Sequence, residues 1–264
     1  MTMTTPTPQR RDWTRDEMIL VLNLYLKLPF GKMYKRNPEV VRLAALIGRT
    51  ANAVALRLVN YAACDPILKQ RGISGMSHGG KKCQEFWDEF INDRDRLLFE
   101  SERILANAEH TTVESKYETV LRNIPEGLTG ETRARVVKTR VNQNVFRQIV
   151  LANYDGKCAL TGIDMPELLV ASHVIPWAEN VQERLNPENG ICLSALYDDA
   201  FDCGLISFDS NCRTIFSTRL RDNVDKVYYK KYFEGMEQAP LATPKKYRLN
   251  PDFLAWHRDC VFKG

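Results

Sequence analysis

One stretch of the sequence, residues 171–204, constrains the fold of this chain more than any other. It reads ASHVIPWAENVQERLNPENGICLSALYDDAFDCG. An apolar run ends at His173 and is broken by Pro176, and an Asn-Gly pair at 189–190 predicts a hairpin-type turn before a second, short apolar run. The closing segment ALYDDAFDCG has a helical pattern that Gly204 stops. The expected order is therefore strand, loop, strand, helix.

The residues around this stretch continue the pattern. A helix is expected through 146–151, with a turn at Asp155 and Gly156 before the first strand. Two further strands are expected within GLISF and TIFST, and a terminal helix within FLAWHRDCVF. The second half of the chain is thus predicted to mix short strands with helices.

The amino-terminal half shows only helical patterns. Thr14 followed by Glu17 is the sequence of a capping box, which predicts the start of a first helix. The segment NPEVVRLAALIG predicts a second helix with Asn at its cap, Pro at its first position and a stop at Gly48. Thr50 is expected to cap a third helix over TANAVALRLVNY, and residues 81–109 to form one long amphipathic helix.

A short glycine-bearing turn between the second and third helices is typical of a helix-turn-helix arrangement. The third helix is then the candidate reader of a major groove, because Asn and Arg side chains suit adenine and guanine edges. The side chains expected to contact DNA are Arg49, Asn52, Arg57 and Asn60. Leu56 falls on the same face.

Residues 12–65 resemble a three-helix domain of the Myb or SANT type. The residues that carry this resemblance are WTRDE, LY, LA, IGRT, AV and RL, in that order. The resemblance implies DNA recognition, but three-helix bundles of this kind also bind proteins, so a protein-interaction module with a solvated polar face is the alternative.

Positive charge is concentrated just ahead of the predicted strands. Residues 131–148 hold five cations and one acid, whereas the whole chain has 37 Lys and Arg against 33 Asp and Glu, a formal net charge of +4. Cations that neutralise phosphates release counterions and add affinity that does not depend on base sequence. Arg133, Arg135 and Arg140 are therefore expected to contact a nucleic-acid backbone, with a solvated helix face as the alternative.

Breakers and weak periodicity divide the chain into regions. Residues 107–130 contain Pro125, Gly127 and Gly130 and are the expected linker. The expected regions are a disordered tail, a helical recognition domain with a spacer helix, this linker and a carboxy-terminal domain, at residues 1–11, 12–106, 107–130 and 131–264.

Composition excludes two classes of protein. No apolar run approaches the ~20 residues that span a bilayer. Seven scattered cysteines, with no C-x-x-C pair and no secretory leader, indicate reduced thiols. We therefore expect a cytoplasmic protein without a membrane segment.

From about Arg133 to Phe262 the chain resembles an HNH endonuclease domain of the ββα-metal type, in the variant common in bacterial restriction enzymes. The motifs that carry the resemblance are FRQIVL, CALTG, ASHVIPW, NPENG, AFDCGLISFD and FLAWHRDCVF. The resemblance implies that His173 is the general base, that Asn189 holds the loop and that Asp198 ligates a metal. The expected fold class is α+β: an all-helical, helix-turn-helix-like domain followed by a ββα-metal HNH nuclease domain.

The chemistry of these residue types is consistent with phosphodiester hydrolysis. Neutral imidazole, with an ordinary pKa of ~6.5, can deprotonate water near neutral pH if its other nitrogen is held. A divalent cation would stabilise charge on the phosphate and the leaving oxygen; Mg²⁺ is expected, with Mn²⁺ or Ni²⁺ as alternatives.

Two departures from the HNH pattern affect the metal site. Ser172 stands where a metal-binding side chain often precedes the base, so either a water is expected between Ser172 and the metal, or Asp202 or Asp199 takes part beside Asp198. Cys158 has Thr161 where the partner cysteine of a zinc knuckle would stand, so no structural zinc is expected.

The sequence therefore predicts a metal-dependent DNA endonuclease with a restriction or phage-defence role. A requirement for modified bases stays open. Cutting a duplex needs two sites, so a homodimer on double-stranded DNA is expected. The alternative is a DNA-binding or regulatory protein with an inactive HNH fold.

Overall fold

The computed structural model describes residues 11–70, 72 and 80–264, so most of the predicted tail lies outside the described residues. Helix α1 (Arg15–Lys27) begins at the predicted capping box, which is confirmed. The Thr14 hydroxyl accepts from the Glu17 N–H, and the Glu17 carboxylate accepts from the Thr14 N–H. Most of α1 is buried, so it forms the centre of the helical half.

Helices α2 (Pro38–Leu46) and α3 (Ala51–Ala62) follow a single turn of 3-10 helix, η1 (Phe30–Lys32). The side chains of Asn37 and Thr50 cap the two helices, as predicted. Between them Gly48 has a φ of +63°, a conformation that favours glycine, which confirms the predicted stop.

The segment predicted as one long helix is two helices, and that prediction was wrong. Helix α5 (Gly80–Phe90) ends before α6 (Arg94–Ala108) begins; a short helix, α4 (Pro66–Gln70), precedes both. The Asp93 side chain accepts from the Arg96 N–H and caps α6. Short polar side chains compete with helical backbone bonds in this way, so the chain turns although the apolar spacing continues.

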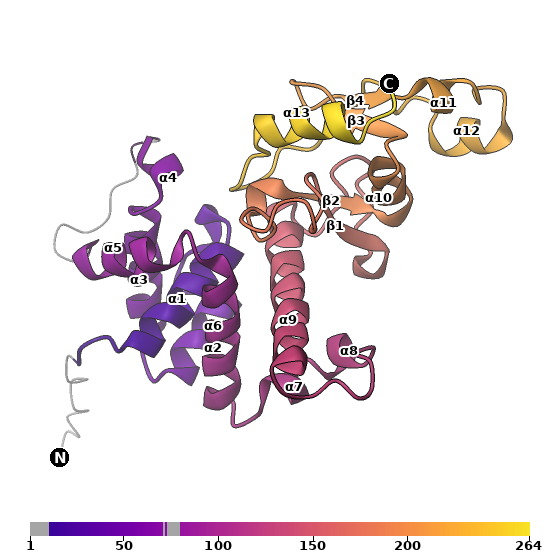
Figure 1. Ribbon diagram of the computed structural model, residues 1–264. Coiled ribbons are helices and arrows are strands. Elements are labelled where there is room, and N and C mark those ends of the chain that lie inside the picture. The colour runs from indigo at the N-terminus through magenta and orange to yellow at the C-terminus, as the bar shows by residue number, and fades with distance from the viewer. Residues whose placement is uncertain (1–10, 71, 73–79) are drawn as a thin grey trace, which may run out of the picture.

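Two short helices, α7 (Val113–Lys116) and α8 (Glu118–Leu121), lie in the predicted linker. Val113 and Tyr117 pack with Val137 of the helix that follows, α9 (Gly130–Asn153). Figure 1 shows α9 as a long helix beside the helical half, with the strand-containing part of the molecule at its far end.

Strands β1 (Leu169–His173) and β2 (Gly190–Ser194) pair antiparallel and are followed by α10 (Ala195–Asp202), which confirms the expected order. The predicted hairpin turn at the Asn-Gly pair was wrong, because Asn189 ends a 3-10 turn, η3 (Pro187–Asn189), of the loop between the strands. A Cβ on Gly190 would lie 2.4 Å from the Val150 Cγ2 of α9. This glycine therefore serves close packing.

The remaining elements confirm the two extra strands and the terminal helix. Gly204 has a φ of +69° and ends α10, as predicted. The elements are η2 (Pro166–Leu168), β3 (Ile206–Phe208), β4 (Thr214–Phe216), α11 (Thr218–Arg221), α12 (Val227–Tyr232) and α13 (Pro251–Cys260).

The two halves of the chain share one continuous cluster of buried apolar side chains, from α1 through α9 to α13. The Lys246 amine, from the carboxy-terminal half, donates to the Tyr25 and Leu28 backbone oxygens at the end of α1. The α+β class is confirmed in this coarse form. No described helix is long and apolar enough to cross a membrane.

Candidate active site

His173 ends β1 and is enclosed by two aromatic side chains. Its ring stacks on Phe146 of α9, with centroids 4.4 Å apart, and meets the Trp177 ring edge-on at 5.6 Å. Its Nε2 lies 2.9 Å from the Arg184 backbone oxygen. A carbonyl oxygen only accepts, so Nε2 carries the proton and Nδ1 keeps its lone pair. Burial lowers the pKa of His173, and the bond to Arg184 offsets part of that shift.

Asn189 fastens the loop that follows His173, and it is fully buried. Its amide oxygen accepts from the Ile175 N–H at 2.7 Å, and its amide nitrogen donates to the Ile175 oxygen at 3.0 Å. The same nitrogen donates to the Glu183 oxygen at 3.3 Å. Because Glu183 precedes Arg184, these bonds also fix the carbonyl that orients the histidine.

Three aspartates of α10, Asp198, Asp199 and Asp202, form an acidic cluster on the side of β1 that faces away from the His173 ring. Asp198 and Asp202 lie one turn apart on the same face of the helix. Partial burial raises the pKa of Asp198, the Ser172 hydroxyl reduces this rise, and Asp199 adds to it. Burial and the charges of Asp198 and Asp199 raise the pKa of Asp202 to about 6. The neighbouring groups that shift these two pKa values are Ser172 and other α10 aspartates, and no cation is among them. The negative charge of the cluster is therefore not compensated by a positive side chain.

Ser172 and His173 point to opposite sides of β1, because side chains alternate along a strand. Ser172 faces α10, and its buried hydroxyl has no well-aligned hydrogen-bond partner among the described residues. Within the same residues, no three His, Cys, Asp or Glu side chains are grouped so as to hold a metal. An orphaned hydroxyl beside carboxylates of raised pKa nevertheless fits a hard divalent cation whose other ligands are water and substrate oxygens.

Cys158 lies where a zinc knuckle would begin, and it makes only hydrogen bonds there. Its sulfur accepts from the Thr161 N–H at 3.4 Å and from the Ser194 N–H at 3.2 Å. All seven cysteines are free thiols. The thiol thus ties the loop before β1 to the end of β2.

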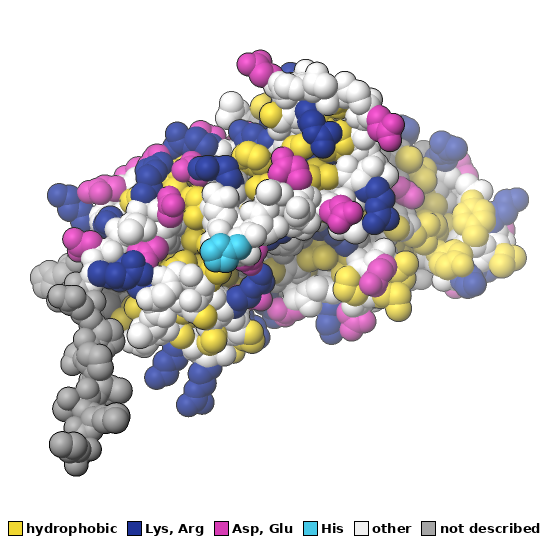
Figure 2. Space-filling model, turned by 90° about the horizontal axis from the view of Figure 1, so that it is seen from below, with side chains coloured by type: hydrophobic (Ala, Val, Ile, Leu, Met, Phe, Trp, Pro, Cys, Tyr) yellow, Lys and Arg dark blue, Asp and Glu magenta, His cyan; other side chains and the backbone are white. Residues whose placement is uncertain are grey.

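The arginines that were predicted to contact a nucleic-acid backbone are exposed on α9. They are Arg133, Arg135 and Arg140. None of them belongs to the ion pairs found between described residues, whereas Lys138 of the same helix pairs with Asp95. Figure 2 shows both signs of charge interspersed over the surface seen from below, so the net charge alone marks no binding surface there. The unpaired arginines are notable because their helix also supports His173.

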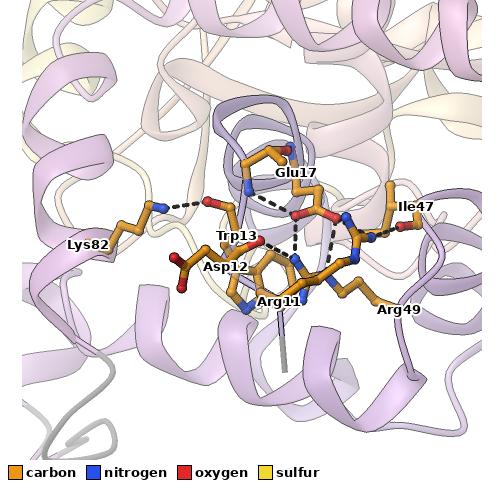
Figure 3. Close-up of polar contacts among 8 residues, drawn as sticks. Arg11, Asp12, Trp13, Glu17, Ile47, Arg49 and Lys82 are labelled. Carbon is orange, nitrogen blue, oxygen red and sulfur yellow. Dashed lines mark hydrogen bonds and ion pairs between the residues drawn. The ribbon is translucent and has the colours of Figure 1, made fainter. Parts of the chain in front are cut away.

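Arg49 is enclosed rather than exposed (Figure 3), with 10% of its side chain accessible. Its guanidinium forms two bonds to the Glu17 carboxylate, at 3.0 and 2.8 Å. It also donates to the Arg11 and Asp12 backbone oxygens and lies 4.5 Å above the centre of the Trp13 ring. Its donors are thus almost all used within the protein, which argues against the predicted contact with a base.

Of the other residues predicted to read DNA from α3, only Asn52 is exposed. Asn60 is buried, and Arg57 lies over the Trp13 ring and donates to the Cys83 sulfur. Leu56 is 40% exposed. Helix α3 packs against α1, α2 and α5, so more of its circumference is covered than a single apolar stripe suggests. Asn60 is buried for this reason, which argues against its predicted contact with DNA.

Sequence reasoning missed Arg184, which acts on His173 through its backbone oxygen, an atom that every residue has. The sequence gives no side-chain signal for such a role. His257 of α13 packs inside the fold: its ring stacks on Phe201 at 3.7 Å, and its Nδ1 lies 2.9 Å from the Ser207 hydroxyl.

Comparison with protein families places a family model described as HNH endonuclease on residues 158–209. No curated protein matches the chain. The matched segment contains β1, β2, α10 and β3, and with them His173, Asn189 and the α10 carboxylates. It supports the HNH family for this part of the chain and, with it, a nuclease activity in general terms.

Proposed function

We propose that the protein is a metal-dependent endonuclease that hydrolyses phosphodiester bonds of double-stranded DNA. The observation that carries this proposal is the hydrogen bond that orients His173, in which Nε2–H donates to the Arg184 backbone oxygen. Nδ1 is then the basic atom, and burial keeps the ring neutral at pH 7 by lowering its pKa. A held, neutral imidazole is what general-base activation of water requires.

In the proposed reaction His173 Nδ1 takes a proton from a water molecule. The water oxygen forms a bond to phosphorus as the bond from phosphorus to the leaving sugar oxygen breaks, and that oxygen takes a proton from solvent. The Nε2–H bond to Arg184 supports the positive charge that the ring gains. Asn189 keeps the loop, and therefore this acceptor, in place.

The residues suited to hold the metal are Asp198, Asp202 and Ser172. When bound, Mg²⁺ or Mn²⁺ would stabilise negative charge on the phosphate and on the leaving oxygen. The raised pKa values of both aspartates support this assignment, because a cation would relieve the repulsion between them.

The DNA backbone is proposed to contact Arg133, Arg135 and Arg140, since all three are exposed on the helix that supports His173. Of the residues predicted on the helical half, Asn52 remains the candidate for a base contact. Two such sites, in a homodimer, would cut both strands, and a restriction or phage-defence role in the cytoplasm agrees with this activity.

The test is cleavage of plasmid and phage DNA with Mg²⁺ or Mn²⁺, comparing the unsubstituted protein with His173→Ala. Loss of a general base lowers rates by ~10² to 10⁴. His110→Ala, at an exposed histidine outside the site, is the matched control and should cleave normally. Repeating the assay on DNA with modified bases tests the modification requirement.

The second candidate, a DNA-binding protein with an inactive HNH fold, is favoured by Ser172, which replaces a stronger metal ligand. It predicts duplex binding without cleavage, with either metal and in both proteins. Cleavage that disappears in His173→Ala and survives in His110→Ala would exclude it.

A further inference from the structure

A hollow of about 480 Å³ lies beside His173, on the outer face of α9. Its lining comes from α9 and from one residue of the loop after β1. The lining residues are Arg135, Val136, Thr139, Arg140, Gln143 and Arg184. Gln143 lies one helical turn before Phe146, whose ring stacks on His173 at 4.4 Å, and the Arg184 backbone oxygen lies 2.9 Å from His173 Nε2, so two residues connect the hollow to the candidate base.

The hollow is positively charged and largely uncompensated. No ion pair among the described residues involves Arg135 or Arg140. The Arg184 guanidinium lies over the Trp177 ring, its Nε is buried without a partner among the described residues, and its ion pair with Asp95 is a long one, at 3.8 Å. That carboxylate is also shared by Lys138 and by the Asn142 amide. Three arginines therefore converge on a space that contains no acid.

We propose that this hollow binds a backbone phosphate of the DNA strand next to the phosphate that is cut. Arg140 and Arg184 would neutralise the phosphate, and Thr139 and Gln143 would give it uncharged hydrogen bonds. Guanidinium groups suit phosphate oxygens because their donors form a planar fork. This inference rests on the proposed function and adds the position of the substrate strand.

Arg184 gives the hollow a second role as a positioning device. Its guanidinium lines the phosphate site, while its backbone oxygen holds His173 Nε2 at 2.9 Å. A phosphate bound to the side chain would therefore fix the carbonyl that orients the base. Arg140 lies on α9 and has no such link, so the two arginines should differ in their effect on turnover.

Duplex binding over a range of salt concentrations tests the site without relying on activity. In a His173→Ala background, Arg140→Gln and Arg184→Gln should each reduce the slope of log K against log salt by ~0.9, the value for one phosphate contact. Gln143→Leu should weaken binding and leave the slope unchanged, because it removes no charge. Arg122→Gln makes the same charge change at an exposed residue outside the hollow and should leave the slope unchanged.

Unchanged slopes in both Arg140→Gln and Arg184→Gln, in a protein that binds and cleaves DNA, would overturn this inference alone. Absence of duplex binding by the unsubstituted protein would overturn the proposed function with it. Arg184→Lys is the control for a loop that misfolds in Arg184→Gln. It keeps the positive charge, so it should keep the slope of log K against log salt. A slope as low as that of Arg184→Gln would contradict the phosphate contact.

The positioning role is tested by steady-state cleavage with His173 present. Arg140→Gln should raise KM with little change in kcat, whereas Arg184→Gln should raise KM and also lower kcat. Equal kcat values for the two variants would show that Arg184 only binds.

Discussion

Arg49, which lies just before α3, and the arginines along α9 have the same side-chain chemistry but opposite surroundings. Arg49 is enclosed, with 10% of its side chain accessible, and is bonded twice to Glu17. Arg133, Arg135 and Arg140 are exposed and take part in no ion pair between described residues. Arg49 is bonded inside the fold, whereas the arginines of α9 are left exposed, and a sequence pattern does not show which arginines find partners within the protein.

The partner of Arg49 explains the difference. Glu17 belongs to the capping box of α1, so its carboxylate is held at the helix start by a local hydrogen bond from the Thr14 N–H. Burial alone would raise the pKa of Glu17, but the bonds from Arg49 and from the Thr14 N–H outweigh it, and the pKa is lowered. The helical half thus uses its arginine to stabilise an internal charge.

The largest effect that distinguishes the two groups is expected from Arg49→Ala. Removing one partner of a buried ion pair costs up to ~3 to 5 kcal/mol, and the cost here should lie at or below the low end because Arg11 still pairs with Glu17 at 2.7 Å. The control is Arg133→Ala, the same change at an exposed arginine, which should unfold like the unsubstituted protein. Urea unfolding measures both. Equal unfolding midpoints for these two variants would show that Arg49 is no more structural than the arginines of α9.

Helix α9 itself carries a second contrast, between its exposed arginines and the face that packs on β2. Gly190→Ala would place a Cβ 2.4 Å from Val150 and 2.9 Å from Phe146, the residue under His173. Overpacking of this kind costs ~1 to 3 kcal/mol. Gly31→Ala, where a Cβ would meet nothing within 4 Å, is the control. A lower melting temperature for Gly190→Ala alone is the expected result, and equal melting temperatures would contradict the packing role.

The two groups also show what the sequence could predict. Helix starts at Thr14, Asn37 and Thr50 were predictable because capping is local, and the order of β1, β2 and α10 followed from breakers and apolar runs. Two other features could not be predicted. The long helix is interrupted because Asp93 caps α6, and Asn60 is buried because α3 is packed on several sides.

The candidate site was predictable to a similar degree. His173, Asn189 and Asp198 came from the resemblance to HNH endonucleases, and the roles that the resemblance implies for them remain predictions. Arg184 and the hollow on α9 could not be predicted, because they arise where a loop meets a helix face far away in sequence. A linear pattern does not specify such a meeting.

A smaller effect is expected from Asn52, the predicted base-reading residue that is exposed on α3. Asn52→Ala should relax discrimination by ~1 to 3 kcal/mol at the base pair it contacts, with the salt slope unchanged because no charge is lost. The combined change of Arg133, Arg135 and Arg140 to Gln should do the opposite and weaken binding to all sequences alike. Sequencing of the cut sites checks both variants. Unaltered cut sites in Asn52→Ala would place recognition elsewhere.

The smallest expected effect on stability concerns a negative charge, that of Asp202 in α10. Asp202 has a pKa of about 6 in the folded chain, raised by burial and by Asp198 and Asp199 from an ordinary value of 3.8. Between these pH values the folded state binds more protons than the unfolded state, so stability falls as pH rises through this window. At neutral pH the charged Asp202 therefore destabilises the fold.

Asp202→Asn should raise the melting temperature at neutral pH, and the gain should shrink below pH 6 and vanish below 3.8, where both states are protonated. Asp164→Asn, the same change at an exposed aspartate outside α10, is the matched control. If these carboxylates hold a metal, Mn²⁺ at one fixed high concentration should stabilise the unsubstituted protein more than Asp202→Asn, because a ligand that binds the folded state more tightly stabilises it more. Equal stabilisation of both proteins by Mn²⁺ would remove Asp202 from the proposed metal site and leave its raised pKa as a simple repulsion within α10.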